Sequence, residues 1–170
     1  DNANNGAADV YKDKNLPIYA SNLCTEIMLP SDHNWSFVCV LSSINVLHYD
    51  KWKDTDAVET MIYFLDAVIT EFLEKLEVYK NSDDLDDQQT FLFMERAYNF
   101  SKENRALGMG VLGWHSLLQS KMLPFDSQGS YDLNSEVFKN IKEHSNKASR
   151  DLAEKFGEPE LLKGYGRRNT

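Results

Sequence analysis

The clearest pattern along the chain is an apolar stripe at helical spacing between residues 56 and 80. A repeat of three and four residues gives one apolar face, so it predicts a long amphipathic helix. Asp56 followed by Glu59 resembles a capping box at its start. The run NSDDLDD should end this helix, because short polar side chains compete for backbone hydrogen bonds. The residues of the stripe are Val58, Met61, Ile62, Leu65, Ile69, Phe72, Leu73 and Leu76.

Two further helices are expected, over residues 88–104 and 135–156. Asn134 is the expected N-cap of the second one, and Gly157 with Pro159 should end it. The expected buried residues are Phe91, Met94, Ala97 and Tyr98 in the first helix and Phe138, Ile141, Ala148 and Leu152 in the second.

The best strand candidate is the apolar, β-branched stretch 35–46, with a short turn or helix at its end. Residues 1–20 form an irregular polar lead-in, and residues 21–30 form a structured loop that ends in proline. Residues 106–119 are glycine-rich and then helical. The pattern therefore predicts a helix-rich, mixed α/β chain, with residues 1–170 as a single segment.

Charge and hydropathy exclude some classes of function. The formal net charge of -9 disfavours a nucleic-acid surface, which needs clustered basic residues. No apolar run approaches the roughly 20 residues that span a bilayer, and the polar opening DNANNGAADVYKDK is not a secretory signal. We therefore expect a cytoplasmic protein without nucleic-acid or membrane partners.

Metal-ligating and disulfide patterns are weak. The four histidines lie far apart in the sequence, so no metal site is predicted. Two cysteines, Cys24 and Cys39, are too few for a disulfide scaffold and are expected to be free or catalytic.

Gly108-x-Gly110-x-x-Gly113 matches the dinucleotide-binding fingerprint, which would make the protein a nicotinamide-dependent oxidoreductase. That site requires a hydrophobic strand leading directly into the glycines, whereas the preceding residues resemble the end of a charged helix. Glycines that allow close helix packing are the favoured interpretation.

The segment Asn22-Leu23-Cys24-Thr25-Glu26 alternates an amide, a thiol and a carboxylate. On an extended backbone these three side chains would project to the same side and could meet one substrate. The alternative is a buried structural cysteine beside a surface glutamate.

Four motifs in this order resemble the large chain of class I ribonucleotide reductases. SNLCTEI, followed by LP, resembles the family's finger loop, and VCVLSSINV resembles its Cys-x-Leu-Ser-x-x-Asn-Leu strand. RALGMGVLGWHSLLQ and GYGRRNT resemble its Gly-x-Gly-Val and Arg-Asn-x-x-Leu segments. The resemblance covers the chain from about residue 17 and implies part of a ten-stranded α/β barrel, with the finger loop at residues 21–30. It also implies that the glycine run is structural.

The resemblance implies a role for each site residue. Cys24 would carry a thiyl radical that abstracts the 3′ hydrogen of the ribose. Glu26 would act as general base on the 3′ hydroxyl, and Asn22 would hydrogen-bond the ribose hydroxyls. Cys39 would be one half of a dithiol that becomes a disulfide. The expected substrate contacts are Ser21, Asn22, Leu23, Cys24, Thr25 and Glu26.

The same resemblance implies that much of the enzyme lies outside these residues. This chain should bind no cofactor directly, because the radical comes from a metal-containing small subunit and nucleotide effectors bind elsewhere. The second redox cysteine, phosphate loop, tyrosine relay and C-terminal cysteines have no counterpart here. We expect the chain to act on a ribonucleotide only with the remainder of the large chain, the small subunit and thioredoxin or glutaredoxin. The form of the SNLCTEI motif is closest to that of the enzymes that use diphosphates. The alternative is a non-catalytic fragment that only binds reductase partners, which the intact Asn22, Cys24, Glu26 and Cys39 disfavour.

Overall fold

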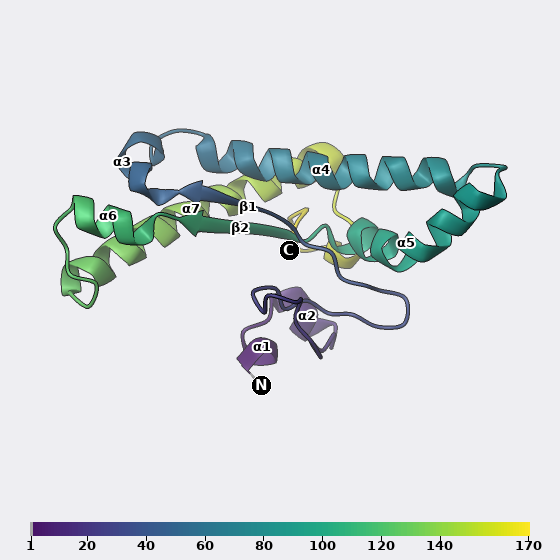
Figure 1. Ribbon diagram of the computed structural model, residues 1–170, viewed down its shortest axis with the longest axis horizontal. Helices are drawn as coiled ribbons and strands as arrows, with labels where there is room; N and C mark the ends of the chain where they lie inside the picture. The colour runs from purple at the N-terminus through teal and green to yellow at the C-terminus, as the bar shows by residue number, and fades with distance from the viewer. Residues whose placement is uncertain (1) are drawn as a thin grey trace.

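The computed structural model describes residues 2–170, which form a helix-rich chain around two strands (Figure 1). The elements are α1 (Asn2–Asn5), α2 (Asp9–Asp13), β1 (Val40–Asn45), the 3₁₀ turn η1 (Val46–His48), α3 (Tyr49–Trp52), α4 (Ala57–Lys80), α5 (Leu85–Asn104), β2 (Leu107–Leu112), α6 (Trp114–Ser120), α7 (Gln128–Phe156) and the 3₁₀ turn η2 (Glu160–Leu162). None of the helices described here is both long and apolar enough to cross a membrane.

The two strands lie side by side and run parallel, with Val40 opposite Leu107 and Asn45 opposite Leu112. Parallel neighbours need a long crossover connection, which α4 and α5 supply here. The predicted mixed α/β class is confirmed, and the arrangement is consistent with part of a barrel. The strand starts at Val40 rather than at residue 35, and the short helical turn expected at its end is η1.

One face of the strand pair is covered by α4 and α7, which run alongside the strands (Figure 1). Ile62 of α4 packs with Ala148 and Leu152 of α7, and Leu107 and Met109 of β2 lie against them. A larger cluster joins Ile44 to α6 and the first half of α7. The side chains that alternate with these on each strand therefore lie on the other face.

The long helices follow the apolar stripes, with differences at their starts. α4 begins at Ala57, but Asp56 makes no side-chain cap, so the predicted capping box is wrong. Glu59 is instead buried, and its Oε1 lies 2.8 Å from Nδ1 of His144. α7 begins at Gln128, seven residues before the predicted start, because Ser127 rather than Asn134 caps it by accepting a hydrogen bond from the Ser130 amide.

Two residues expected in the core are exposed, namely Met94 and Phe138. The other expected core residues of these helices are buried, such as Phe91, Tyr98 and Ile141, except Ala97, which is half-buried. Phe138 nonetheless has the ring of Trp114 as a neighbour, with centroids 6.5 Å apart.

The N-terminal residues are more ordered than an irregular lead-in. α1 and α2 lie on the opposite side of the strands from α4 in Figure 1. Val10 and Tyr11 of α2 are buried in a second core cluster, which also includes Phe100 of α5, Ala106 just before β2, and the turn η2. The segment therefore packs onto the rest of the fold.

Candidate active site

Residues 22–27, within the predicted structured loop, form a tight turn. The Asn22 amide donates to the carbonyl of Ile27 at 3.1 Å, and the Ile27 amide donates to the side-chain Oδ1 of Asn22 at 3.0 Å. Thr25 has a φ of 68°, in the left-handed region. The backbone thus reverses between residues 22 and 27, so the extended backbone that would align Asn22, Cys24 and Glu26 is not present in this conformation.

The turn presents its central residues to the outside. Leu23 is 99% exposed, and Cys24 is an exposed free thiol. Asn22 is half-buried because its side-chain oxygen closes the turn. Of the predicted substrate-contacting residues, Leu23, Cys24, Thr25 and Glu26 are exposed, and Ser21 and Asn22 are half-buried. An exposed loop tip can reach a ligand or another part of a protein.

Cys39 lies immediately before β1 and is a half-buried free thiol. Burial raises the pKa of the Cys39 thiol, and the nearby Glu26 carboxylate raises it further because two negative charges would repel. The thiol is therefore protonated at neutral pH. A protonated thiol is a weak nucleophile but keeps its S–H hydrogen.

Glu26 and Cys39 line one cavity of about 420 Å³, between the N-terminal segment, the finger loop and the start of the strands. Gly108, Tyr11 and Thr170 also line it. Asn22 and Cys24 do not line this cavity. The structure therefore brings together one carboxylate and one thiol of the predicted set, and it places the other two residues on the adjoining turn.

Tyr11 is a residue of this cavity that the sequence interpretation missed. Its buried hydroxyl donates to Oγ1 of Thr170 at 2.9 Å, and the Leu107 amide donates to the carbonyl of Thr170 at 3.1 Å. Burial raises the pKa of Tyr11 to about 12, so the hydroxyl stays protonated. Four- and five-residue helices are too short to show helical periodicity, which left no signal for Tyr11.

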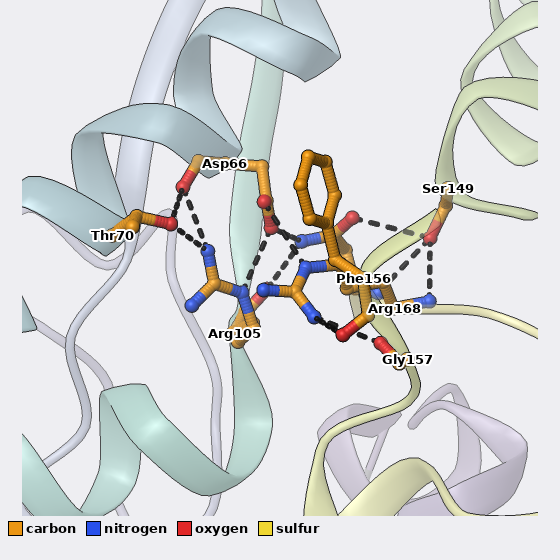
Figure 2. A network of polar contacts seen from close by, with 8 residues as sticks. Asp66, Thr70, Arg105, Ser149, Phe156, Gly157 and Arg168 are labelled. Carbon is orange, nitrogen blue, oxygen red and sulfur yellow. Dashed lines mark hydrogen bonds and ion pairs between the residues drawn. The ribbon is translucent and has the colours of Figure 1, made fainter. Parts of the chain in front are cut away.

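A buried ionic network holds the segment that carries Thr170 (Figure 2). Asp66 of α4 accepts from Nε of Arg105 at 2.8 Å and from Nε of Arg168 at 3.2 Å. The Asn169 side chain donates to the same carboxylate at 2.8 Å, and Ser149 Oγ of α7 accepts from the Asn169 amide at 2.9 Å. Residues 168–169 are thereby fixed to α4, to α7 and to Arg105, which lies just before β2.

The charge state of Asp66 follows from this network. Burial by itself would raise the pKa of Asp66, but hydrogen bonds and charges from Arg105, Asn169 and Arg168 outweigh it and lower the pKa. The side chains of Asp66 and Arg105 are each only 5% exposed. Asp66 is therefore a charged structural group, away from the cavity at Cys39.

The glycine motif lies in a strand rather than between helices. Gly108 and Gly110 are inside β2, opposite Leu41 and Ser43 of β1, so the prediction of close helix packing is wrong. Only Gly113, with a φ of 80°, lies at the junction between strand and helix. A dinucleotide fingerprint needs its glycines after the strand, which excludes that interpretation.

Within residues 2–170 no three His, Cys, Asp or Glu side chains are grouped so that they could hold a metal ion. The chemistry-bearing groups of the cavity are thus a thiol, a carboxylate and hydroxyls. A parallel β-α-β unit is typical of an α/β domain, and this one carries a thiol and a carboxylate beside the start of its strands.

Comparison with known proteins identifies which domain it is. The family model described as "Ribonucleotide reductase, barrel domain" matches residues 1–168, and the chain belongs to this family. The resemblance noted in the sequence, and the assignment to part of that barrel, are confirmed.

Individual relatives agree. The chain is 38% identical over 170 residues to the putative ribonucleoside-diphosphate reductase large subunit of Frog virus 3, and 34% identical over 169 residues to the large subunit of Invertebrate iridescent virus 3. These alignments cover 100% and 99% of this chain but 28% and 25% of the relatives. A solved structure, the Actinobacillus ureae class Id ribonucleotide reductase alpha subunit, is 54% identical with a TM-score of 0.87, covering 99% of this chain and 30% of that one. The chain thus spans little more than a quarter of the length of these proteins.

Proposed function

We propose that this chain is the part of a ribonucleoside-diphosphate reductase large subunit that carries the radical cysteine Cys24 and one redox thiol, Cys39. Family membership over residues 1–168 is the observation on which this rests. The shared cavity of Glu26 and Cys39, with the turn of Cys24 beside it, supports the proposal. The substrate would be a ribonucleoside diphosphate and the compartment the cytoplasm.

The proposed reaction begins at Cys24. A thiyl radical there takes the 3′ hydrogen of the ribose, and Glu26 takes the proton of the 3′ hydroxyl as the 2′ oxygen leaves as water. Two thiols, Cys39 and a second cysteine outside this chain, together give two electrons and two protons and become a disulfide. One of these hydrogens leaves in the water, and the other is added to the 2′ carbon. Cys24 then returns its hydrogen to the 3′ carbon, which regenerates the radical, and Glu26 returns the proton to the 3′ oxygen, which restores the hydroxyl and the carboxylate.

The protonation state of Cys39 suits this role. A thiol that must give both a proton and an electron has to be protonated beforehand, and burial with the nearby Glu26 carboxylate raises the pKa of Cys39. Exposure of Cys24 on a turn would let it meet a substrate held by the remainder of the large chain. The turn must be shielded from water in the assembled enzyme, because an exposed radical would be quenched.

The proposed partners are the remainder of the large chain, a radical-generating small subunit and a thioredoxin or glutaredoxin. The radical and its metal centre would belong to the small subunit, and nucleotide effectors would bind outside residues 1–170.

The test uses the complete large subunit with its small subunit. We expect Cys24→Ser to abolish turnover of ribonucleoside diphosphates while subunit assembly is retained. Cys39→Ser should abolish turnover supported by thioredoxin or glutaredoxin, and Ser135→Ala, at an exposed position on α7, should keep most of it. The radical role is rejected if the Cys24→Ser enzyme assembles and still turns over, and catalytic function is rejected if the unmodified enzyme assembles but is inactive.

A further inference from the structure

The two strands have different faces. Val40, Ser42 and Ile44 of β1 are directed to the helices, and Leu41 and Ser43 lie on the opposite face. Gly108 and Gly110 of β2 lie on that opposite face too, because their missing side chains would meet Cys39, Leu41 and Ser43. The face away from α4 and α7 therefore carries the Cys39 thiol and two glycines.

Space, rather than backbone conformation, requires glycine at position 108. The glycines with positive φ in the described residues are Gly113, Gly157, Gly164 and Gly166, and Gly108 is not among them. A Cβ atom at Gly108 would lie 2.9 Å from Sγ of Cys39 and 3.1 Å from Cβ of Leu41. Real Cβ atoms are essentially never found as close as 2.9 Å to another heavy atom, and 3.1 Å is tighter than most such contacts, so a neighbour would have to move.

The neighbour that moves most easily is the thiol. Sγ of Cys39 ends a side chain with one rotatable bond, whereas Leu41 Cβ is fixed to the strand that pairs in register with β2. An alanine at 108 would thus push the sulfur off its place above β2. The sulfur would then have a different position relative to Glu26, which lines the same cavity.

We propose that Gly108 is a positioning residue for the redox thiol, since its missing side chain sets where the sulfur of Cys39 lies. This rests on the proposed redox function of Cys39. Disulfide formation tolerates a narrow range of sulfur positions and torsion angles. A displaced sulfur would therefore slow the step in which Cys39 and the second cysteine lose two hydrogens to the substrate and form the disulfide.

Gly110 provides a matched control. A Cβ atom there would lie 2.8 Å from Oγ of Ser43, two residues further along the same strand pair. Gly110→Ala therefore crowds β1 through a hydroxyl, whereas Gly108→Ala crowds it through the thiol. General loosening of the strands would follow from either substitution.

The experiment uses the complete large subunit with its small subunit, fully reduced, with ribonucleoside diphosphate and no external reductant. After rapid acid quench, peptide mass spectrometry gives the fraction of Cys39 in a disulfide over time. We expect Gly108→Ala to slow disulfide formation by at least about tenfold, as expected for misplaced reacting groups. Gly110→Ala should stay within about threefold of the unmodified enzyme, well below one tenfold step in rate. Equal rates in all three enzymes, or equal slowing by both alanines, would overturn the positioning role.

A second readout is the pH profile of Cys39 alkylation by iodoacetamide, resolved by peptide. A sulfur moved relative to Glu26 should change the midpoint in Gly108→Ala but not in Gly110→Ala, and an unchanged midpoint counts against the proposal. If Gly108→Ala does not fold, the double variant with Cys39→Ala must fold, because the contact with Sγ is gone. Failure of both to fold would assign Gly108 to the contact with Leu41 instead. Absence of a Cys39 disulfide in the unmodified enzyme would instead overturn the proposed function.

Discussion

Removing the negative charge of Asp66 should loosen residues 168–170 from the helices. Asp66→Asn keeps the shape of the side chain but leaves the guanidinium of Arg105 without its carboxylate, at a site only 5% exposed. Arg168 donates to Oδ2 and Asn169 to Oδ1, so one of them loses its acceptor whichever oxygen the amide replaces. The introduced amide would also turn an NH₂ group towards these donors in at least one orientation.

The magnitude follows from the burial of the pair. Breaking a buried ion pair by removing one partner costs about 3–5 kcal/mol, because an uncompensated charge stays buried. At about 1.36 kcal/mol per tenfold, this corresponds to about 10²- to 10⁴-fold in a local opening equilibrium. The amides that should report it are those of Leu107, which donates to Thr170, and of Arg168 and Asn169, which donate to Ser149.

Native-state hydrogen exchange of the complete large subunit, resolved by peptide, measures this opening. Asp151→Asn is the matched control, since Asp151 pairs with Lys147 on the exposed surface of α7 and such pairs contribute little. The reasoning is refuted if the exchange rates in the Asp66→Asn variant stay within about tenfold of those in the unmodified protein at Leu107, Arg168 and Asn169. The expected change in the opening equilibrium is larger than that.

The pH dependence has a definite sign. The folded-state pKa of Asp66 is below its ordinary value of 3.8, so the network's contribution is present above pH 3.8 and is lost as the pH falls through the lowered folded-state pKa. Protection of the same amides should therefore fall with acidification in the unmodified protein. In Asp66→Asn this component of the pH dependence should be missing.

Two smaller changes test local features by the same measurement. Ser127→Ala should destabilise the first turn of α7 by about 1 kcal/mol, because the Ser130 amide loses its cap. If Asn134 were the N-cap instead, this substitution would leave the exchange of the first turn unchanged. Tyr11→Phe should weaken protection of the α2 amides by about 1 kcal/mol, because the buried hydrogen bond to Thr170 is lost. Tyr19→Phe is the control, because that side chain is 79% exposed, and it should leave exchange unchanged. An equal loss of protection in the Tyr11→Phe and Tyr19→Phe variants would contradict the reasoning.

The long helices were predictable because each buries one stripe over many turns. Val58, Ile62, Leu65 and Ile69 are all buried on α4, as the spacing indicated. The start of α7 was not, because residues 128–134 are polar and carry few apolar positions, so the hydrophobic pattern begins later than the helix. The true cap is Ser127, upstream of that pattern.

The candidate site was predictable only in part. The order of the motifs indicated the family and thereby the candidate residues Cys24, Glu26 and Cys39. Only the fold shows that Glu26 and Cys39 share a cavity. The turn at residues 22–27 depends on an Asn22 side chain that closes it and on Thr25 at positive φ. Threonine rarely adopts that conformation, so local propensity favours an extended chain there.

Neither β2 nor its glycines could be recognised from propensity, since glycine weakens a strand interior. Their pairing depends on β1, which is separated from β2 in the sequence by both α4 and α5. A side chain at Gly108 has no room beside Cys39 and Leu41, and only the folded strand pair reveals that crowding.

The Arg-Asn motif near Thr170 gains a physical explanation from the network. Arg168 and Asn169 bind Asp66 through side chains that reach from the end of the chain to the middle of α4, 102 and 103 residues away in sequence. Thr170, the next residue, is hydrogen-bonded to Tyr11 and Leu107, and all three line the cavity of Cys39. A defect in the ionic network should thus reach the thiol cavity through a short stretch of backbone. If the redox role of Cys39 holds, Asp66→Asn should slow its oxidation although Asp66 does not line that cavity, which ties the buried charges on the helix side to the chemistry on the opposite face.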